Sequence, residues 1–319
     1  MRLLYNIEDL AFVAGPTHLA IGVFDGIHLG HQAVIGRALR NARQSGGSAV
    51  VVTFDPHPVQ VLRPEKAPRL LMAPEQKRRL LEDLGVSALL TIAFTREFSK
   101  TSAELFVEKL PRAANELREI CVGEDWRFGA NRSGEAVLLQ SLVQRHGIEL
   151  NAVSPVRMND QTVSSTRVRA AVDRGDLKEA SLLLGRPFAL WSTVTAVNSP
   201  FGGLFCLAEA TPDSNSNQLP PDGMYAVRGS QDGKEYRGVA NVNRLTQEER
   251  ERFVQLRISG VNARFASAEM ELTLLQYLCP KISTPSCTEQ IAQDALWAKE
   301  IQDMESRAED NVDFCDLAF

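Results

Sequence analysis

Two histidines stand three residues apart in the stretch GVFDGIHLGHQ, residues 22–32. His28 and His31 flank Gly30, and they are two of only five histidines in the chain. A neutral imidazole can donate a hydrogen bond to a phosphoryl oxygen, and a protonated imidazole adds positive charge. The spacing is too short for the HExxH zinc motif, and no Glu follows at the position that this motif requires. The pair therefore favours phosphate chemistry, with a purely structural role as the alternative.

The elements around the histidines support a phosphate site. The apolar run HLAIGVF at 18–24 predicts a buried strand, and apolar residues at helical spacing predict a helix that begins near the histidines. The first turn of a helix offers free N–H groups and the positive end of the helix dipole, which together favour an anion. The chain contains neither a GxxxxGK[ST] loop nor a GxGxxG fingerprint. We therefore expect the anion to bind where this strand meets the helix.

Further strands and helices alternate along the first half of the chain. The predicted strands lie at 48–54, 88–94, 119–123 and 148–156, and the predicted helices lie at 74–85, after a Thr101–Glu104 capping box, and at 134–147. Such alternation is typical of βαβ units and a parallel sheet. The stretches TFDPHP and VGEDWRFG follow the second and fourth strands. Because ligands bind at the carboxyl ends of parallel strands, we expect three loops to form one site.

Composition limits the class of protein. The 319 residues carry a net charge of −5 with 44% hydrophobic residues, and no apolar run is long enough for a membrane span. The five cysteines are scattered without a CxxC pair, and the N-terminus lacks a signal-peptide profile. We expect a cytoplasmic protein with small-molecule partners and neither nucleic-acid nor membrane partners. The sequence does not report the oligomeric state.

The pattern changes after Pro187. Stretches 191–197, 224–230 and 235–242 predict antiparallel strands, and a helix is expected from about residue 288 to 307. We therefore predict two domains. The first, 1–187, is an α/β nucleotide-binding domain with a Rossmann-like parallel sheet. The second, 188–319, is a small antiparallel β-barrel that is followed by a C-terminal helix and a tail.

Four motifs in register carry a resemblance to a known family. GVFDGIHLGHQ, TFDPHP, VGEDWRFG and SSTRVRAAVDRG, over about residues 18–190, resemble the FMN adenylyltransferase module of the bacterial riboflavin kinase/FAD synthetase family. This resemblance implies a nucleotidyltransferase domain that converts FMN and ATP to FAD and pyrophosphate. It also implies Mg²⁺ bound with ATP, bridging phosphate oxygens, and we assign no protein ligand to that metal.

The resemblance also implies roles for individual residues. The catalytic residues would be His28, His31 and Arg169. The ATP-binding residues would be Gly22, Phe24, Asp25, Gly30, Ser164, Ser165 and Thr166. The flavin-binding residues would be Phe54, His57, Pro58, Asp125 and Phe128.

Several of these residues have structural alternatives. Phe54 could be only the last core residue of its strand, and His57 could only hold the turn between two prolines. Asp25 could cap the turn that presents His28, and the SST triplet could be an ordinary helix cap.

The second domain departs from the family. LPPDGMYAV and YRGVANVN resemble strands of its riboflavin kinase domain, but the PTxN motif, whose Thr and Asn hold magnesium and ATP phosphate in the family, does not occur in the chain. The family also uses a glutamate base within a strand, and residues 252–268 contain no acidic residue. We therefore expect a FAD synthetase that has lost kinase activity. The alternatives are a fully bifunctional enzyme, adenylyl transfer to another phosphate acceptor, and a non-catalytic flavin-binding or regulatory protein.

Overall fold

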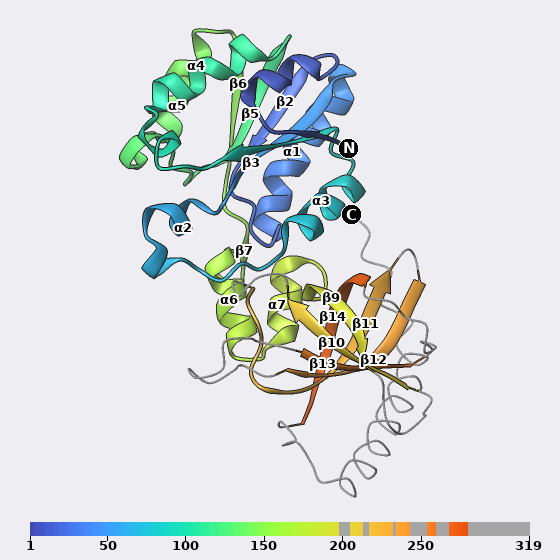
Figure 1. Cartoon of the computed structure of the whole chain (residues 1–319). Coiled ribbons are helices and arrows are strands. Elements are labelled where there is room, and N and C mark those ends of the chain that lie inside the picture. Colours follow the sequence, from blue (N-terminus) through green and yellow to red (C-terminus); the bar gives the residue numbers. More distant parts are fainter. Residues whose placement is uncertain (198–204, 213–216, 232–233, 243–253, 260–267, 280–319) are drawn as a thin grey trace, which may run out of the picture. The chain divides into compact units, whose positions relative to one another are not determined.

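The computed structural model describes residues 1–197, 205–212, 217–231, 234–242, 254–259 and 268–279. The chain forms two compact units (Figure 1). Unit 1 comprises Met1–Val168 and Leu183–Gly185, and unit 2 comprises Arg169–Leu182 and Arg186–Phe319. The single boundary predicted after residue 187 stays a prediction.

Unit 1 is built on a parallel sheet of six strands, as the sequence predicted. In sheet order they are β1 (Arg2–Leu4), β4 (Ala88–Ala93), β3 (Ser48–Asp55), β2 (Thr17–Ile21), β5 (Leu117–Gly123) and β6 (Glu149–Val153). The edge strand β1 was not predicted, because three residues are too short for a recognisable apolar period.

Both faces of the sheet are covered by helices, so its strands are apolar on both sides. One core contains the buried face of α1 (Leu29–Ser45) and of α3 (Pro74–Asp83), together with Ala20 of β2. The other contains η1 (Ile7–Phe12), α4 (Ala103–Ala113) and α5 (Ala136–Gln144), together with Leu19 of β2. The five residues on which the first helix was predicted are all buried: Val34, Ile35, Ala38, Leu39 and Ala42.

The order of the strands determines where loops diverge. From β2 the chain moves outward in one direction through β3 and β4, and then returns to the other side of β2 to form β5 and β6. The loop after β2 and the loop after β5 therefore leave the sheet at a topological switch point, where open α/β sheets bind their ligands.

Shorter elements follow these strands. The remaining described helices are α2 (Pro58–Leu62), η2 (Pro64–Lys66), η3 (Phe98–Lys100), η4 (Ala130–Arg132), α6 (Ser165–Asp173) and α7 (Leu177–Leu184). A small hairpin joins β7 (Arg157–Met158) to β8 (Gln161–Thr162).

Unit 2 contains a closed antiparallel barrel, which confirms the predicted fold class. Its strands are β9 (Ala189–Val197), β10 (Phe205–Pro212), β11 (Gly223–Gln231), β12 (Lys234–Val242), β13 (Val254–Ser259) and β14 (Ala268–Cys279). The predicted C-terminal helix and tail lie outside the described residues. No helix within the described ranges is long and apolar enough to cross a membrane.

One sequence prediction was wrong in detail. The capping box expected at Thr101 is replaced by Ser102, whose side chain accepts a hydrogen bond from the backbone N–H of Leu105 at 3.2 Å. Both residues have the short oxygen-bearing side chain that caps a helix, so the sequence placed the start of α4 one residue too early.

A polar network is buried at the amino ends of β2 and β5. His18 Nδ1 lies 2.8 Å from Glu119 Oε2, and His18 Nε2 lies 2.8 Å from the hydroxyl of Ser45. The amide groups of Asn41 and Asn151 also donate to Glu119. Ser45 lies in the last turn of α1, where the negative end of the helix dipole would oppose an oxyanion, so we interpret this Ser–His–Glu chain as structural.

This network predicts a stability effect. His18→Leu leaves the Glu119 carboxylate buried with amide donors alone, so we expect the free energy of unfolding to fall by about 3–5 kcal/mol at neutral pH. The double variant His18→Leu/Glu119→Leu should recover most of this loss, because no buried charge remains. Urea unfolding followed by tryptophan fluorescence measures both effects. A change below about 1 kcal/mol in the single variant would contradict the interpretation.

Candidate active site

His28 caps the helix that leaves the switch point. It is buried with extended backbone, and its Nδ1 accepts a hydrogen bond from the backbone N–H of His31 at 3.4 Å. When Nδ1 accepts, a neutral His28 carries its proton on Nε2, which makes Nε2–H a hydrogen-bond donor. The side chain thus fixes the first turn of α1 and directs a donor away from it.

The two predicted imidazoles lie together. The rings of His28 and His31 stack with centroids 3.7 Å apart and an angle of 20° between them, and the edge of the Phe24 ring packs near His31 at 5.2 Å. Gly30 leaves room for this stack, since a Cβ at that position would lie 3.2 Å from two atoms of the His28 ring. Four predicted residues of the histidine motif, Phe24, His28, Gly30 and His31, therefore lie together at a helix N-terminus.

The loop before His28 has an unusual backbone. Phe24 and Ile27 have positive φ angles of 51° and 39°, which side chains other than glycine rarely adopt. Gly26 has a φ of +84°, and a Cβ there would approach the Leu71 side chain to 2.8 Å. Residues in such conformations persist where surrounding contacts hold them, and they concentrate at functional sites.

Asp25 supplies part of that restraint. Its buried carboxylate accepts from the backbone N–H of Leu71 at 2.9 and 3.2 Å, and its carbonyl accepts from the hydroxyl of Ser165 at 2.9 Å. These contacts support the structural alternative for Asp25, in which it holds the turn that presents His28. Its predicted contact with ATP stays untested.

The SST triplet also takes on structural roles. Ser164 Oγ accepts from the backbone N–H of Arg167 at 3.3 Å at the start of α6, and Ser165 holds Asp25. Thr166 is exposed, and Arg169 lies further along α6 in unit 2. Gly22 follows β2, where a Cβ would lie 3.0 Å from the Phe24 ring. Ligand contacts of these residues remain predictions.

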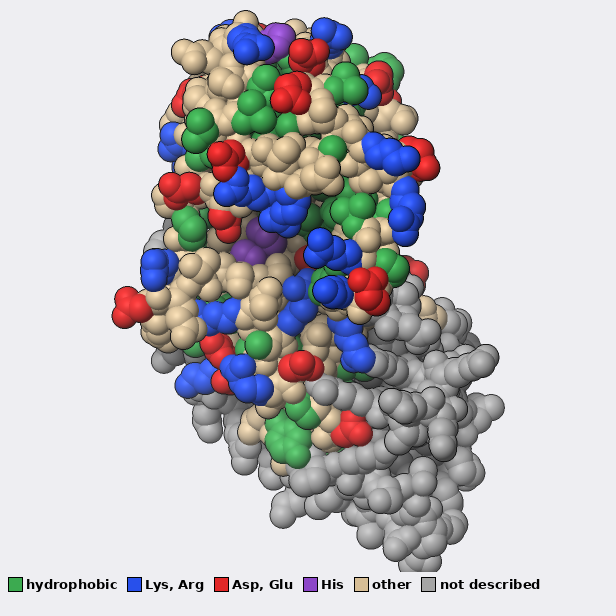
Figure 2. All heavy atoms as spheres, turned by 90° about the vertical axis from the view of Figure 1, so that its left-hand side faces the viewer, with side chains coloured by type: hydrophobic (Ala, Val, Ile, Leu, Met, Phe, Trp, Pro, Cys, Tyr) green, Lys and Arg blue, Asp and Glu red, His purple; other side chains and the backbone are tan. Residues whose placement is uncertain are grey.

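A groove of about 1020 Å³ lies in unit 1 beside the loops that follow β2 and β3. Its volume is at the upper end of small-molecule pockets. Aromatic side chains form much of its wall: Phe54, Phe94, Phe98, Phe106, Trp126 and Phe128. Basic side chains also line it: Arg63, Lys66, Lys100, Arg127 and Arg132. Figure 2 shows a hollow in which histidine side chains are recessed and which Lys and Arg side chains border.

The aromatic wall is a connected cluster. Trp126 and Phe128 stack in parallel with centroids 4.5 Å apart. Phe98 packs edge-on against Phe94 at 5.7 Å and against Phe106 at 6.2 Å. Flat faces that are fixed in this way suit a planar aromatic ligand.

The structure places four of the five predicted flavin residues on this groove: Phe54, His57, Pro58 and Phe128. His57 also caps α2, since its Nδ1 accepts from the backbone N–H of Val59 at 3.2 Å. Asp125 is exposed in the loop after β5 and is not among the residues that line the groove. Sequence reasoning missed Phe94 and Phe98, although Phe94 ends a predicted strand and Phe98 follows that strand at the same sheet edge.

The barrel of unit 2 changes one sequence inference. Residues 252–268 contain no acidic side chain, but β14 continues to Cys279 and carries Glu269 and Glu271. Glu271 is half-buried and pairs in register with Trp191 of β9. Burial lowers the pKa of Arg186 to about 10, and the nearby Glu271 acts in the opposite direction. Acidic strand residues are therefore present directly after the segment 252–268.

Two family models match the chain. A model described as FAD synthetase matches residues 13–167, and a model described as riboflavin kinase matches residues 207–302. The first contains the histidine pair and the groove, and the second contains most of the barrel strands.

Curated relatives carry one common description, bifunctional riboflavin kinase/FMN adenylyltransferase. The protein from Bacillus subtilis is 32% identical over 226 residues, which cover 70% of this chain and 71% of that protein. The protein from Pseudomonas fluorescens is 33% identical over 250 residues, covering 76% and 77%. The protein from Buchnera aphidicola (subspecies Acyrthosiphon pisum) is 27% identical over 303 residues, covering 93% and 96%.

A solved structure is also similar. A crystal structure described as a macrolide-efflux protein from Streptococcus pneumoniae has a TM-score of 0.78 at 26% identity, covering 94% of this chain and 98% of that chain. A TM-score reports backbone similarity, so this likeness concerns the fold.

The geometry predicts an anion response that depends on the histidine pair. Inorganic pyrophosphate should shift the imidazole NMR signals of His28 and His31 and leave those of the exposed His146 unchanged, because the pair stands at the N-terminus of α1 whereas His146 follows the C-terminus of α5. Gly30→Ala should weaken pyrophosphate binding about tenfold or more by displacing the His28 ring. Equal shifts at all three histidines would refute a specific site.

Proposed function

Because the chain belongs to the bacterial bifunctional riboflavin kinase/FMN adenylyltransferase family, we propose that unit 1 transfers AMP from ATP to FMN, which yields FAD and pyrophosphate. The observation that carries this proposal is the common edge of the sheet. A helix N-terminus capped by two histidines follows β2, and a large aromatic groove begins at the ends of β2 and β3. One site can thus hold phosphates beside a planar ring.

The reaction needs no covalent group from the protein. A phosphate oxygen of FMN attacks the α-phosphorus of ATP, a new P–O bond forms, and the bond to the bridging oxygen breaks with its electron pair leaving on pyrophosphate. Catalysis then consists of alignment and stabilisation of charge on the phosphoryl oxygens. We assign this stabilisation to Nε2–H of His28, to His31 and to the N–H groups in the first turn of α1.

Mg²⁺ bound with ATP would supply further neutralisation of phosphate charge. Within the described residues, no three His, Cys, Asp or Glu side chains are grouped so that they could hold a metal ion. In this proposal the ion would be held mainly by phosphate oxygens and water, as Mg²⁺ often is.

The flavin ring would lie in the aromatic groove. We assign Phe54 and Phe128 to its faces, as the family resemblance implied, and add Phe98 as a third aromatic wall. His57 and Pro58 would border the ring at the start of α2. The prediction for Asp125 would require this exposed side chain to turn toward the groove. A cytoplasmic location remains part of the proposal.

A chromatographic assay with Mg·ATP and FMN tests the adenylyl transfer. We expect the wild-type chain to form FAD, and His28→Ala to lower kcat about 100-fold or more, because one donor to the developing charge is lost. His146→Ala, an exposed histidine on the same unit, should leave the rate within about twofold. FAD formation at a near-normal rate by His28→Ala would remove this residue from the catalytic set. Flavin binding without turnover by the wild-type chain would favour the non-catalytic alternative.

We infer riboflavin kinase as a second activity, located in unit 2. The match of the riboflavin kinase model to residues 207–302 favours the bifunctional alternative over the loss of kinase that the missing PTxN motif led us to expect. Glu271, a half-buried carboxylate on β14, is the residue that we propose as the base for the riboflavin hydroxyl.

The kinase proposal has its own test. With riboflavin and Mg·ATP as substrates, Glu271→Gln should lower FMN formation about 100-fold, because the general base is lost. The neighbouring and exposed Glu269→Gln on the same strand is the matched control and should act like wild type. Conversion of FMN to FAD should continue in both variants. A wild-type chain that makes FAD from FMN but no FMN from riboflavin would restore the interpretation of a lost kinase.

A further inference from the structure

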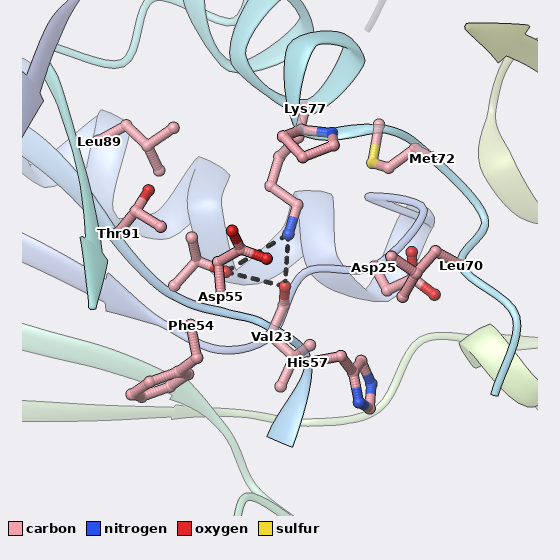
Figure 3. A pocket seen from close by; sticks show the side chains of 12 residues that line it. Val23, Asp25, Phe54, Asp55, His57, Leu70, Met72, Lys77, Leu89 and Thr91 are labelled. Atoms are coloured by element: carbon pink, nitrogen blue, oxygen red, sulfur yellow. Dashed lines mark hydrogen bonds between the residues drawn. The ribbon is translucent and has the colours of Figure 1, made fainter. Parts of the chain in front are cut away.

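A half-buried lysine lies next to the loops of the proposed site. Lys77 lies on α3, and its side chain enters a small cavity of about 70 Å³ together with Asp25, Asp55 and His57 (Figure 3). Its Nζ donates to the carbonyl oxygen of Val23 at 2.9 Å and lies 3.5 Å from the hydroxyl of Thr53.

The three groups form a closed set of hydrogen bonds. Thr53 Oγ1 also donates to the Val23 carbonyl oxygen, at 2.9 Å, so one carbonyl receives both donors. Figure 3 shows the Lys77 ammonium group directed at this point from α3. The carbonyl belongs to the loop after β2, and the hydroxyl belongs to the last part of β3.

These two contacts lie directly before the two halves of the site. Val23 is followed by the strained turn at Phe24 and then by His28, which caps α1. Thr53 is followed by Phe54 and then by His57, both of which line the aromatic groove. The ammonium group therefore joins the segment that presents the phosphate site to the segment that presents the groove wall.

The ammonium group of Lys77 is partly removed from water, which disfavours its charged form. Burial lowers the pKa of Lys77, and the nearby carboxylates of Asp25 and Asp55 act in the opposite direction. The carboxylate of Asp25 is already held by the backbone N–H of Leu71. A buried ammonium group generally adds less to stability than an apolar side chain of the same size, so stability alone does not account for a lysine here.

We propose that Lys77 is a positioning residue for adenylyl transfer, which fixes the distance between the histidine loop after β2 and the groove wall after β3. Lys77 contacts neither substrate and acts through the backbone of Val23 and the hydroxyl of Thr53. This inference rests on the proposed adenylyl transfer. Because a misplacement of about 1 Å can lower a rate 100-fold, a rigid link between the two halves would act on kcat.

Lys77→Met tests the link, because it keeps the length of the side chain and removes the ammonium group. We expect kcat for FAD formation to fall about 10- to 100-fold, with the KM values for ATP and FMN within about threefold of wild type. The melting temperature should fall only modestly, because the buried Asp25 carboxylate loses a nearby cation but keeps its hydrogen bond from the backbone N–H of Leu71. Lys109→Met, at an exposed position on α4, is the matched control and should change neither quantity.

A second measurement does not depend on activity. Hydrogen exchange should become faster in Lys77→Met at residues 22–31 and 53–60 together, and stay unchanged in the strands of the sheet. If wild type makes no FAD, the proposed function fails, and the exchange pattern still decides whether Lys77 links the two segments. Unchanged exchange in both segments would overturn the link.

A milder variant covers the case in which Lys77→Met does not fold. Thr53→Val removes the hydroxyl from the same node and should lower kcat about 3- to 10-fold, with KM again preserved. Where both variants fold, the double variant should lose less than the product of the two single effects, because both changes act on one carbonyl. Rates within twofold of wild type in both single variants would overturn the proposal.

Discussion

The cap that His28 places on α1, at the switch point of a parallel sheet, is the interaction on which the rest of the site depends. The order of the strands brings the loops after β2 and β5 to one edge, and the helix that begins there directs its free N–H groups outward. The cap assigns the proton of a neutral His28 to Nε2, so the same side chain ends the loop and offers a donor to phosphate.

The loop that presents this cap is held by contacts from distant parts of the chain. Its positive φ angles at Phe24 and Ile27 are conformations that local sequence disfavours. Asp25 joins the loop to Leu71 and Ser165, and Lys77 joins it to β3. Asp25 and Ser165, which the motifs implied as ATP contacts, thus also hold the loop that presents His28. A sequence motif alone therefore does not distinguish a residue that binds the ligand from one that holds the loop in place.

The sequence predicted the parallel sheet, because each of its longer strands is a short apolar run bounded by a turn. It also predicted the site edge, because three loops of unusual composition follow strands whose carboxyl ends must meet. It missed Phe98 and Lys77 for a shared reason. Their importance arises from packing across the fold: Phe98 of η3 meets Phe54 of β3, and Lys77 reaches the loop after β2 and Thr53 of β3 from a helix whose sequence is typical of an amphipathic surface helix.

The central claim is that the histidine-capped helix and the aromatic groove act as one site for adenylyl transfer to FMN. A single-turnover reaction with ATP labelled at the α-phosphate tests it most directly, because it follows the atom that must move. The account predicts that the label enters FAD and that one unlabelled pyrophosphate is released for each FAD formed. Label recovered only in AMP or ADP, with FMN unchanged, would contradict it.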